Sequence, residues 1–322
     1  MLKLAKQIFH KISRPSLVVI AGPTASGKSS LAVEIALELA RSGKGAEIIS
    51  ADSRQIYREI PIFSGAIDEE EQNNITHHLL GSESVQEEAR TASWFREEAD
   101  KLIREIHSRG GVPILVGGSG LWIQGVLCED EYPDVAPNPE LRALLDTYSI
   151  EELQAKLASM DDRRSQEVDS NNRRRLIRSI EIASVLGTVP VMGYTMRSEW
   201  EVQAIYCNYP KDVNDSRIRD NVALRVEAGM LEEAKQVYDM VDESRFKELG
   251  LAYKHLARYW EGELDIDELQ DRIATEEIRY AKRQRTFFDK MFAQLPIKPY
   301  VITKRDERTP VINKILGHYR HS

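Results

Sequence analysis

The eight-residue segment GPTASGKS, residues 22–29, constrains this chain more than any other stretch. An apolar run over residues 17–21 precedes it, and Leu31, Ile35 and Leu39 follow at the spacing of one helix face. A strand, a glycine-rich turn and a helix in this order form a phosphate-binding loop, because backbone N–H groups and the helix N-terminus surround the phosphate oxygens. The predicted diphosphate- or nucleotide-binding residues are Gly22, Pro23, Thr24, Ala25, Ser26, Gly27, Lys28 and Ser29.

Two side chains of this loop bear on chemistry. Lys28 supplies a fixed positive charge, and the hydroxyl of Ser29 is a suitable ligand for Mg²⁺. The loop does not reveal what becomes of the phosphate, because kinases, NTPases and transferases that release diphosphate all need it. The sequence therefore predicts an anion site with Mg²⁺ as cofactor and leaves the reaction open at this point.

Composition limits the kind of protein this is. The 322 residues, 42% of them hydrophobic, are enough for an α/β core with one appended domain. The formal net charge is −8, so a nucleic acid would have to be held by local basic patches. The two cysteines, Cys128 and Cys207, lie far apart, which favours unpaired thiols in a reducing cytoplasm. No apolar run approaches the roughly 20 residues of a membrane span, so we expect no membrane partner.

The basic first fifteen residues are free of acids and place Leu4, Ile8 and Ile12 on one helical face. Such a segment is typical of a short organellar presequence or of a helical tail packed on the core. Both interpretations remain open from the sequence.

Two further strand–loop junctions predict the rest of the crevice. The run 47–51 reads as a buried strand followed by Asp52, and the run 112–116 is followed by a second glycine-rich turn that contains Ser119. Ligands of doubly wound sheets bind at the carboxyl ends of the strands, so we expect Asp52 and Ser119 to face the same crevice as Lys28. His77 and His78 suggest another short strand, in which their side chains would point to opposite faces and serve structure rather than one metal.

The chain changes character after Cys128, where three prolines precede a series of helical patterns. We predict an inserted helical lobe over residues 128–199, between two parts of the core at 1–127 and 200–322, with a returning strand at 202–206. The expected fold class is α/β, a P-loop-type parallel sheet flanked by helices, with the inserted lobe and C-terminal helices.

Two arginine-rich segments supply local positive charge in this acidic chain. One, residues 171–178, stands at a predicted helix start in the lobe, where phosphates are favoured by both charge and helix dipole. The other follows one face of the last predicted amphipathic helix, with Arg279, Lys282 and Arg283 opposite an apolar back that includes Tyr280 and Gln284. We expect both segments to contact phosphates.

These segments together resemble a known family. GPTASGKS, DSRQIYR, HHL, PILVGGSGLW, RRLIRSIE, the pair Arg217-Ile218 and AKRQRTFF occur in the order found in the tRNA dimethylallyltransferase (tRNA isopentenyltransferase) family, over nearly the whole chain. No zinc-ligand cluster trails the core, which favours the bacterial type. The resemblance implies transfer of a dimethylallyl group from dimethylallyl diphosphate to N6 of the adenosine on the 3′ side of the tRNA anticodon, with diphosphate leaving and no ATP consumed.

The resemblance also assigns roles to residues. Asp52 matches the acid that takes the N6 proton, Ser119 stands where the family usually has threonine, and Lys28, Ser29 and Arg217 match groups that neutralise diphosphate and hold Mg²⁺. The catalytic set is thus Asp52, Ser119, Lys28 and Arg217. The partner implied is the anticodon stem-loop of tRNA, bound by a monomer through Asp52, Ser53, Arg54, Gln55, Ser119, Arg173, Arg174, Arg175, Arg279, Lys282, Arg283, Gln284 and Arg285.

The chain also departs from the family pattern. Residues 59–75 lack the usual family run after the tyrosine motif, so this segment looks shortened. Asn221 stands where many relatives carry a second arginine, which predicts fewer or rearranged contacts to the phosphates. Three other functions compete: an adenylate isopentenyltransferase acting on free nucleotide, a P-loop kinase or NTPase, and a non-catalytic RNA-binding protein. The lobe and the late basic helix argue against the first, the lack of a dedicated adenine motif against the second, and the intact Lys28, Ser29, Asp52 and Ser119 against the third.

Overall fold

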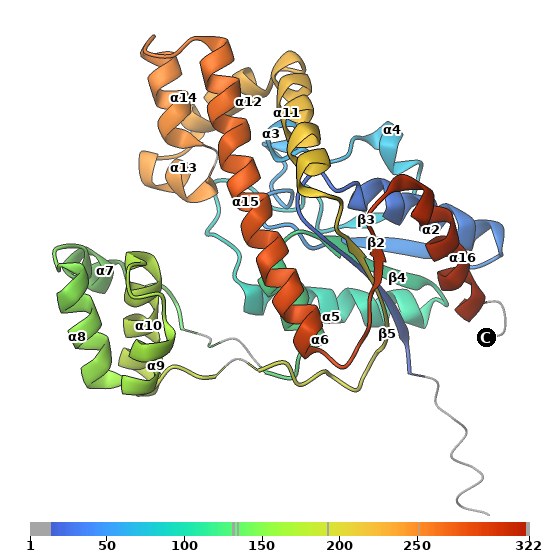
Figure 1. Ribbon diagram of the computed structural model, residues 1–322, viewed down its shortest axis with the longest axis horizontal. Helices are drawn as coiled ribbons and strands as arrows, with labels where there is room; N and C mark the ends of the chain where they lie inside the picture. The colour runs from blue at the N-terminus through green and yellow to red at the C-terminus, as the bar shows by residue number, and fades with distance from the viewer. Residues whose placement is uncertain (1–13, 131–132, 134, 192, 251, 320–322) are drawn as a thin grey trace, which may run out of the picture. The chain divides into compact units, whose positions relative to one another are not determined.

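A computed structural model describes residues 14–130, 133, 135–191, 193–250 and 252–319 (Figure 1). Residues 1–13 lie outside the described residues. They make up most of the basic N-terminal segment for which a presequence or a helical tail was predicted. The chain divides into two compact units. The larger comprises the residues up to Cys128 and those from Tyr194 onward, and the smaller is Glu129–Gly193.

A six-stranded parallel sheet forms the larger unit, in the order β3-β2-β4-β1-β5-β6. The α/β prediction is confirmed, and five strands lie where the sequence indicated them; the short strand β6 was not predicted. Ala21 pairs with Gly117 and Ser50 with Val116, so the neighbouring strands β2, β4 and β1 end at nearly the same level. The strands are β1 (Ser16–Ala21), β2 (Ala46–Ser50), β3 (His77–His78), β4 (Val112–Gly117), β5 (Glu201–Cys207) and β6 (Tyr300–Ile302).

Alternate side chains of each strand enter two separate cores. Val18 and Ile20 pack with α2 (Lys28–Arg41) and α16 (Arg308–Tyr319) on one face. Leu17, Val19 and Ala21 pack on the other face, in a larger core that also contains α5 (Ala92–Ser108) and α6 (Gly120–Leu127). Burial on both faces explains why the strands read as continuous apolar runs instead of alternating ones.

Further helices of the larger unit contribute to this second core. Gly229, at φ 99°, separates α11 (Lys211–Glu227) from α12 (Met230–Met240). The long helix α15 starts with a capping box between Asp265 and Glu268. It is not the last helix, because β6, a 3₁₀ turn and α16 follow it. The bounds are α3 (Pro61–Ser64), α4 (Glu69–Gln72), α11 (Lys211–Glu227), α12 (Met230–Met240), α13 (Glu243–Leu249), α14 (Tyr253–Trp260), α15 (Ile266–Gln294) and the 3₁₀ turn η1 (Arg305–Glu307).

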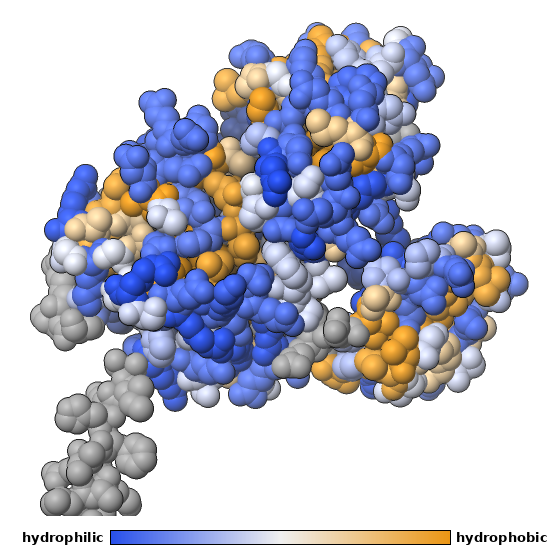
Figure 2. Space-filling view, turned by 180° about the vertical axis from the view of Figure 1, so that it is seen from behind, coloured by the Kyte–Doolittle hydropathy of each residue, from blue (hydrophilic) through white to orange (hydrophobic). Residues whose placement is uncertain are grey.

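The smaller unit is helical and has its own core. Leu145, Leu153, Leu157 and Leu176 are fully buried within it. Its helices are α7 (Pro139–Asp146), α8 (Ile150–Met160), α9 (Asp162–Glu167) and α10 (Arg173–Leu186). Figure 2 shows hydrophobic side chains on the surface of this unit, whose exposed apolar residues are Leu144, Val185, Leu186 and Val191.

The boundary of the smaller unit at Gly193 falls before the predicted end at residue 199. Residues 194–200 pack with the larger unit, where buried Arg197 donates two hydrogen bonds of 2.8 Å to Asp100 on α5. The backbone N–H of Arg197 also donates to the carbonyl of Leu127. A composition pattern does not reveal such a long-range ion pair.

The structure also bears on the two cysteines and on the presence of membrane-spanning helices. Cys128 and Cys207 are both buried and are not joined in a disulfide, as predicted. Among the described helices, none is both long enough and apolar enough to cross a membrane.

Candidate active site

The phosphate-binding loop joins β1 to α2. Gly27 sits at φ 72°, a left-handed conformation that suits glycine, and serves as the N-cap of α2. A side chain at Gly22 would place its Cβ 2.5 Å from the carbonyl oxygen of Cys207, so the loop can lie against β5 only with glycine there. The Lys28 ammonium donates to the Pro23 carbonyl at 2.6 Å, and the Ser26 hydroxyl donates to the same oxygen at 2.8 Å. These two bonds close the loop into the concave shape that the motif predicts.

The two other predicted loops meet at the carboxyl edge of the sheet. The Ala51 N–H donates to the Val116 carbonyl at 2.7 Å, and the Ser119 N–H donates back to the Ala51 carbonyl at 3.1 Å. The Ser53 N–H donates to the Ser119 hydroxyl oxygen at 2.9 Å. Only glycine fits at residue 117, where a Cβ would lie 2.0 Å from the Ala51 oxygen. The structure thus brings the loops of Asp52 and Ser119 together, as expected.

Asp52 and Lys28 interact electrostatically across this edge. Desolvation lowers the pKa of Lys28, and the nearby Asp52 carboxylate raises it in part. One Asp52 carboxylate oxygen accepts the Arg54 N–H at 3.0 Å, which orients the side chain within its turn. A cationic phosphate loop therefore faces a carboxylate that can accept a proton.

Tyr280 on α15 is a site residue that the sequence analysis placed on the apolar back of its helix. Its hydroxyl lies near the Ser119 side chain, and desolvation together with the Asp52 charge raises its pKa, so the phenol stays protonated at neutral pH. The guanidinium groups of Arg54 and Arg283 lie 5.0 and 5.7 Å from the centre of its ring. These three residues line a cavity of about 210 Å³. Tyr280 and Gln284 are four residues apart on one helix face, and this spacing was the signal available in the sequence.

Gln284 joins the two glycine-rich turns. Its side chain is buried; the Oε1 atom accepts the Thr24 N–H at 2.9 Å, and the Nε2 atom donates to the Gly118 carbonyl at 2.9 Å. The sequence predicted that Gln284 contacts tRNA. In the structure both ends of its amide have partners within the larger unit, because the residue lies on the inward face of α15, and contact with tRNA stays a prediction.

Arg217 lies beside the phosphate loop, as its predicted role requires. Its guanidinium carbon is 4.1 Å from the centre of the Tyr209 ring, and both residues line a second cavity together with Ala25, Gly27 and Asn221. Asn221, the position at which a thinner or rearranged set of phosphate contacts was predicted, thus lies in the wall of the same cavity.

The remaining predicted tRNA-binding residues divide into exposed and internally bonded groups. Arg279, Lys282 and Arg283 form an exposed basic face of α15, and Arg174 and Arg175 are exposed on α10. Others bond within their own units: Arg285 donates to the Tyr209 carbonyl at 2.9 Å, Arg173 to the Leu145 carbonyl at 3.2 Å, and Gln55 to the Gly65 carbonyl at 3.0 Å. Contact with tRNA stays a prediction for both groups.

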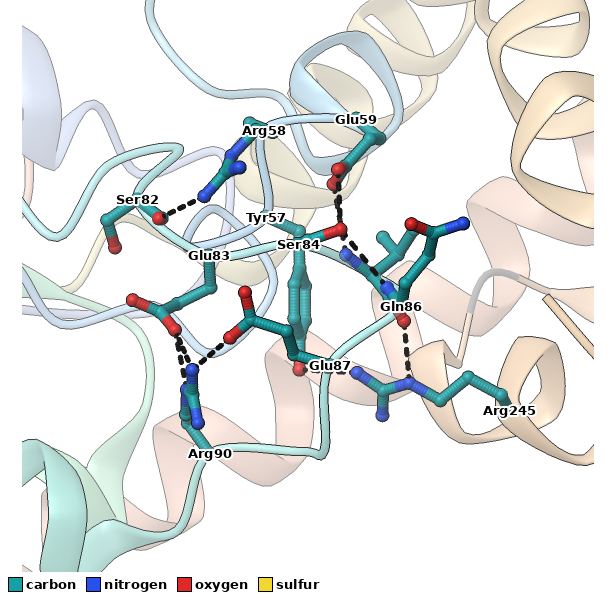
Figure 3. Close-up of polar contacts among 11 residues, drawn as sticks. Tyr57, Arg58, Glu59, Ser82, Glu83, Ser84, Gln86, Glu87, Arg90 and Arg245 are labelled. Carbon is teal, nitrogen blue, oxygen red and sulfur yellow. Dashed lines mark hydrogen bonds and ion pairs between the residues drawn. The ribbon is translucent and has the colours of Figure 1, made fainter. Parts of the chain in front are cut away.

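The segment after the Asp52 loop is fastened by a polar network (Figure 3). Glu59 accepts hydrogen bonds from the Ser84 hydroxyl at 2.8 Å and the Val85 N–H at 3.0 Å. Arg245 on α13 donates to the Val85 carbonyl at 2.9 Å and to the Tyr57 hydroxyl at 3.1 Å. Val85 therefore links Glu59, the first residue of the segment 59–75, to Arg245 of α13.

The metal prediction rests on Ser29. Within the described ranges no three His, Cys, Asp or Glu side chains cluster as a metal site, and His77 and His78 bond to the Ile75 carbonyl and the Glu47 carboxylate. Mg²⁺ needs few protein ligands when phosphate oxygens and waters complete its shell, so a single hydroxyl beside a phosphate loop fits this ion.

Comparison with known proteins gives a consistent result. Residues 55–291 match the family model for IPP transferase. The chain is 34% identical over 84% of its length to a tRNA dimethylallyltransferase of Leuconostoc mesenteroides, covering 89% of that protein, and 36% identical over 85% to one of Streptococcus sanguinis, covering 90%. It also resembles the crystal structure of a tRNA isopentenylpyrophosphate transferase from Bacillus halodurans, with 31% identity, a TM-score of 0.66, and coverage of 94% of this chain and 96% of that one.

Proposed function

The chain belongs to the IPP transferase family, and from this premise we propose that its crevice transfers a dimethylallyl group from dimethylallyl diphosphate to N6 of the adenosine on the 3′ side of the tRNA anticodon, releasing diphosphate. The chain is a prenyltransferase that modifies tRNA, as its relatives are named. The observation that carries the detailed proposal is the juxtaposition of the cationic phosphate loop with Asp52 at one edge of the sheet.

This juxtaposition suits a substitution at an allylic carbon. The bond between C1 of the dimethylallyl group and the diphosphate oxygen breaks, and its electron pair leaves with the diphosphate. The lone pair of N6 forms the new bond to C1, and the N6 proton passes to the Asp52 carboxylate. Atoms and charge balance without an oxidant, a reductant or ATP.

The leaving group is stabilised by positive charge that is already in place. Lys28, the N–H groups of the loop and Arg217 surround the position where negative charge develops. Ser29 would hold Mg²⁺, and the ion would supply further neutralisation of the diphosphate charge. The Ser119 hydroxyl oxygen, which accepts the Ser53 N–H, keeps the Asp52 loop oriented, and the Tyr280 hydroxyl lies beside it.

The acceptor side of the proposal rests on charge and aromatic surface. The adenine must leave the stack of the anticodon loop, a cost of about a few kcal/mol that contacts to the protein offset. Arg54, Tyr280 and Arg283 offer an aromatic ring flanked by two cations, which suits a base and its phosphates. The exposed arginines of α10 and α15 supply further phosphate contacts. We retain a monomer and a cytoplasmic location as parts of this proposal.

Incubation of the full chain with unmodified tRNA and dimethylallyl diphosphate, followed by nucleoside analysis, tests the proposal. We expect N6-dimethylallyladenosine from transcripts that carry adenosine after the anticodon, and none when that position is guanosine. The Asp52→Asn variant serves as the inactive control. Prenylation of adenosine monophosphate without prenylation of tRNA would favour the free-nucleotide reaction and contradict the proposal.

A further inference from the structure

A second cavity, of about 380 Å³, lies against the phosphate loop. One wall is the loop itself with Ala25 and Gly27, another is Arg217 on α11, and a third comes from the segment after β6, with Arg305 and Arg308. Three arginines thus line the cavity, and no carboxylate is among its lining residues. Such an excess of positive charge beside a phosphate loop favours the binding of an anion.

Arg308 attaches the C-terminal segment to the phosphate loop. One of its terminal nitrogens donates to the Gly27 carbonyl at 2.8 Å, and the other donates to Glu34 at 2.8 Å and to the Ser30 hydroxyl at 3.2 Å. Only 11% of its side chain is exposed. Because Glu34 balances its charge, Arg308 is better suited to position the segment than to bind an anion by itself.

Arg305 differs from Arg308 in its exposure to solvent and in its lack of a carboxylate partner among the described residues. It is exposed, and within the described part of the chain its side chain has no ion pair or hydrogen bond. Its neighbours are engaged elsewhere, since Lys304 pairs with Asp306 at 3.0 Å and Glu307 accepts the Thr303 N–H at 2.7 Å. Arg217 likewise rests on the Tyr209 ring without a carboxylate partner among the described residues. Two guanidinium groups of uncompensated charge therefore face one cavity.

We infer that Arg305, held in place through Arg308, is a diphosphate-binding residue that works with Arg217 on the phosphate farther from the loop. The phosphate loop has room and N–H donors for one phosphate group, and the adjoining arginines extend the site to a second. The ligand class is a diphosphate, either that of the prenyl donor or the released product, so the inference rests on the proposed function. The family match ends at residue 291, and Arg305 and Arg308 lie beyond it, whereas Arg217 lies within it.

The same guanidinium chemistry would also suit a backbone phosphate of tRNA, so the test separates the two sources. We would measure the binding of inorganic diphosphate and of inorganic phosphate to the full chain by calorimetry in Mg²⁺ buffer, and of tRNA by filter retention. Arg305→Ala should weaken diphosphate binding about five- to tenfold, the effect of losing one charge-assisted contact at an exposed site. Binding of inorganic phosphate and of tRNA should stay within about twofold.

Lys304→Ala is the matched control, because it removes one positive charge from the adjacent exposed residue, which does not line the cavity. It should leave diphosphate binding unchanged. An equal loss in both variants would indicate a general charge effect and overturn the inference, as would unchanged diphosphate binding in Arg305→Ala. A loss of tRNA affinity in place of diphosphate affinity would assign Arg305 to the RNA and overturn it as well.

A double-mutant cycle tests the positioning role of Arg308. If Arg308 acts through Arg305, then Arg308→Gln weakens diphosphate binding and adding Arg305→Ala weakens it no further. Additive losses would contradict the positioning role. Binding is measured without turnover, so failure of the prenyl-transfer assay would leave these results interpretable on their own.

Discussion

Replacement of Gln284 by alanine is the most discriminating change that the structure suggests. The buried amide accepts the Thr24 N–H and donates to the Gly118 carbonyl, each at 2.9 Å, and so ties the phosphate loop to the turn before Ser119. Gln284→Ala removes both bonds at once. It leaves a backbone donor in one loop and a backbone acceptor in the other without their partner.

The size of the expected loss follows from the two backbone groups left without a partner, the Thr24 N–H and the Gly118 carbonyl. A buried polar group left without a partner costs about 1–3 kcal/mol, and entry of water into the crevice lowers that cost. Two groups at the low end give about 2 kcal/mol, shared between the stability of the fold and the affinity for diphosphate. If about 1.4 kcal/mol of it falls on the phosphate loop, the dissociation constant for dimethylallyl diphosphate rises roughly tenfold.

Calorimetry with dimethylallyl diphosphate and filter retention with tRNA measure the two affinities separately. We expect the diphosphate affinity to fall and the tRNA affinity to stay near that of the unchanged protein, because the side chain does not reach the surface. Thr286→Ala is the control on the same helix, since that hydroxyl donates only to the Lys282 carbonyl of its own helix. The opposite pattern, with tRNA affinity lost and diphosphate affinity kept, would refute this reasoning and restore the role predicted from sequence.

The other predictions concern the proton acceptor Asp52, the partly buried Tyr280 phenol, the basic faces and the partly buried Glu47 carboxylate. Asp52→Ala should lower kcat by about 10²-fold or more with little change in tRNA affinity, and near-normal turnover would exclude it as the base. Tyr280→Phe should lower kcat about tenfold, because the polar hydroxyl beside Ser119 and Asp52 is lost, while the KM for dimethylallyl diphosphate stays unchanged; a change in that KM alone would argue against an orienting role. Arg174→Glu and Arg283→Glu should each raise the KM for tRNA. Each should also reduce the slope of log K for tRNA binding against log salt concentration by roughly one, whereas unchanged slopes would indicate that neither residue contacts a phosphate. Hydrogen bonds from Arg109 and His78 lower the pKa of Glu47 to about 2, so its stabilising contribution is complete above pH 4.5 and is lost as the pH falls toward 2; urea unfolding of Glu47→Gln across this range should show a flatter pH dependence, and an identical curve would contradict the assignment.

The sequence alone was sufficient for the features that depend on local patterns. The phosphate loop, five of the six strands and α2 follow from glycine positions and apolar periodicity, which act over a few residues. The meeting of Asp52 and Ser119 could also be expected, because parallel strands place their carboxyl ends at one edge. The family was recognisable from the order of these local segments.

Only the tertiary structure decided the roles that depend on distant contacts. Gln284 meets Thr24 across 260 residues and Gly118 across 166, and Arg308 meets Gly27 across 281, so no local pattern distinguishes these residues from others on a basic or amphipathic helix. The strand β6 is three residues long and half-exposed, too short for a period to be read from it. Helix propensity and charge show that α15 is basic outside and apolar inside, but its rotation against the sheet, set by side-chain packing, determines that Tyr280 and Gln284 point into the crevice while Lys282 and Arg283 remain exposed.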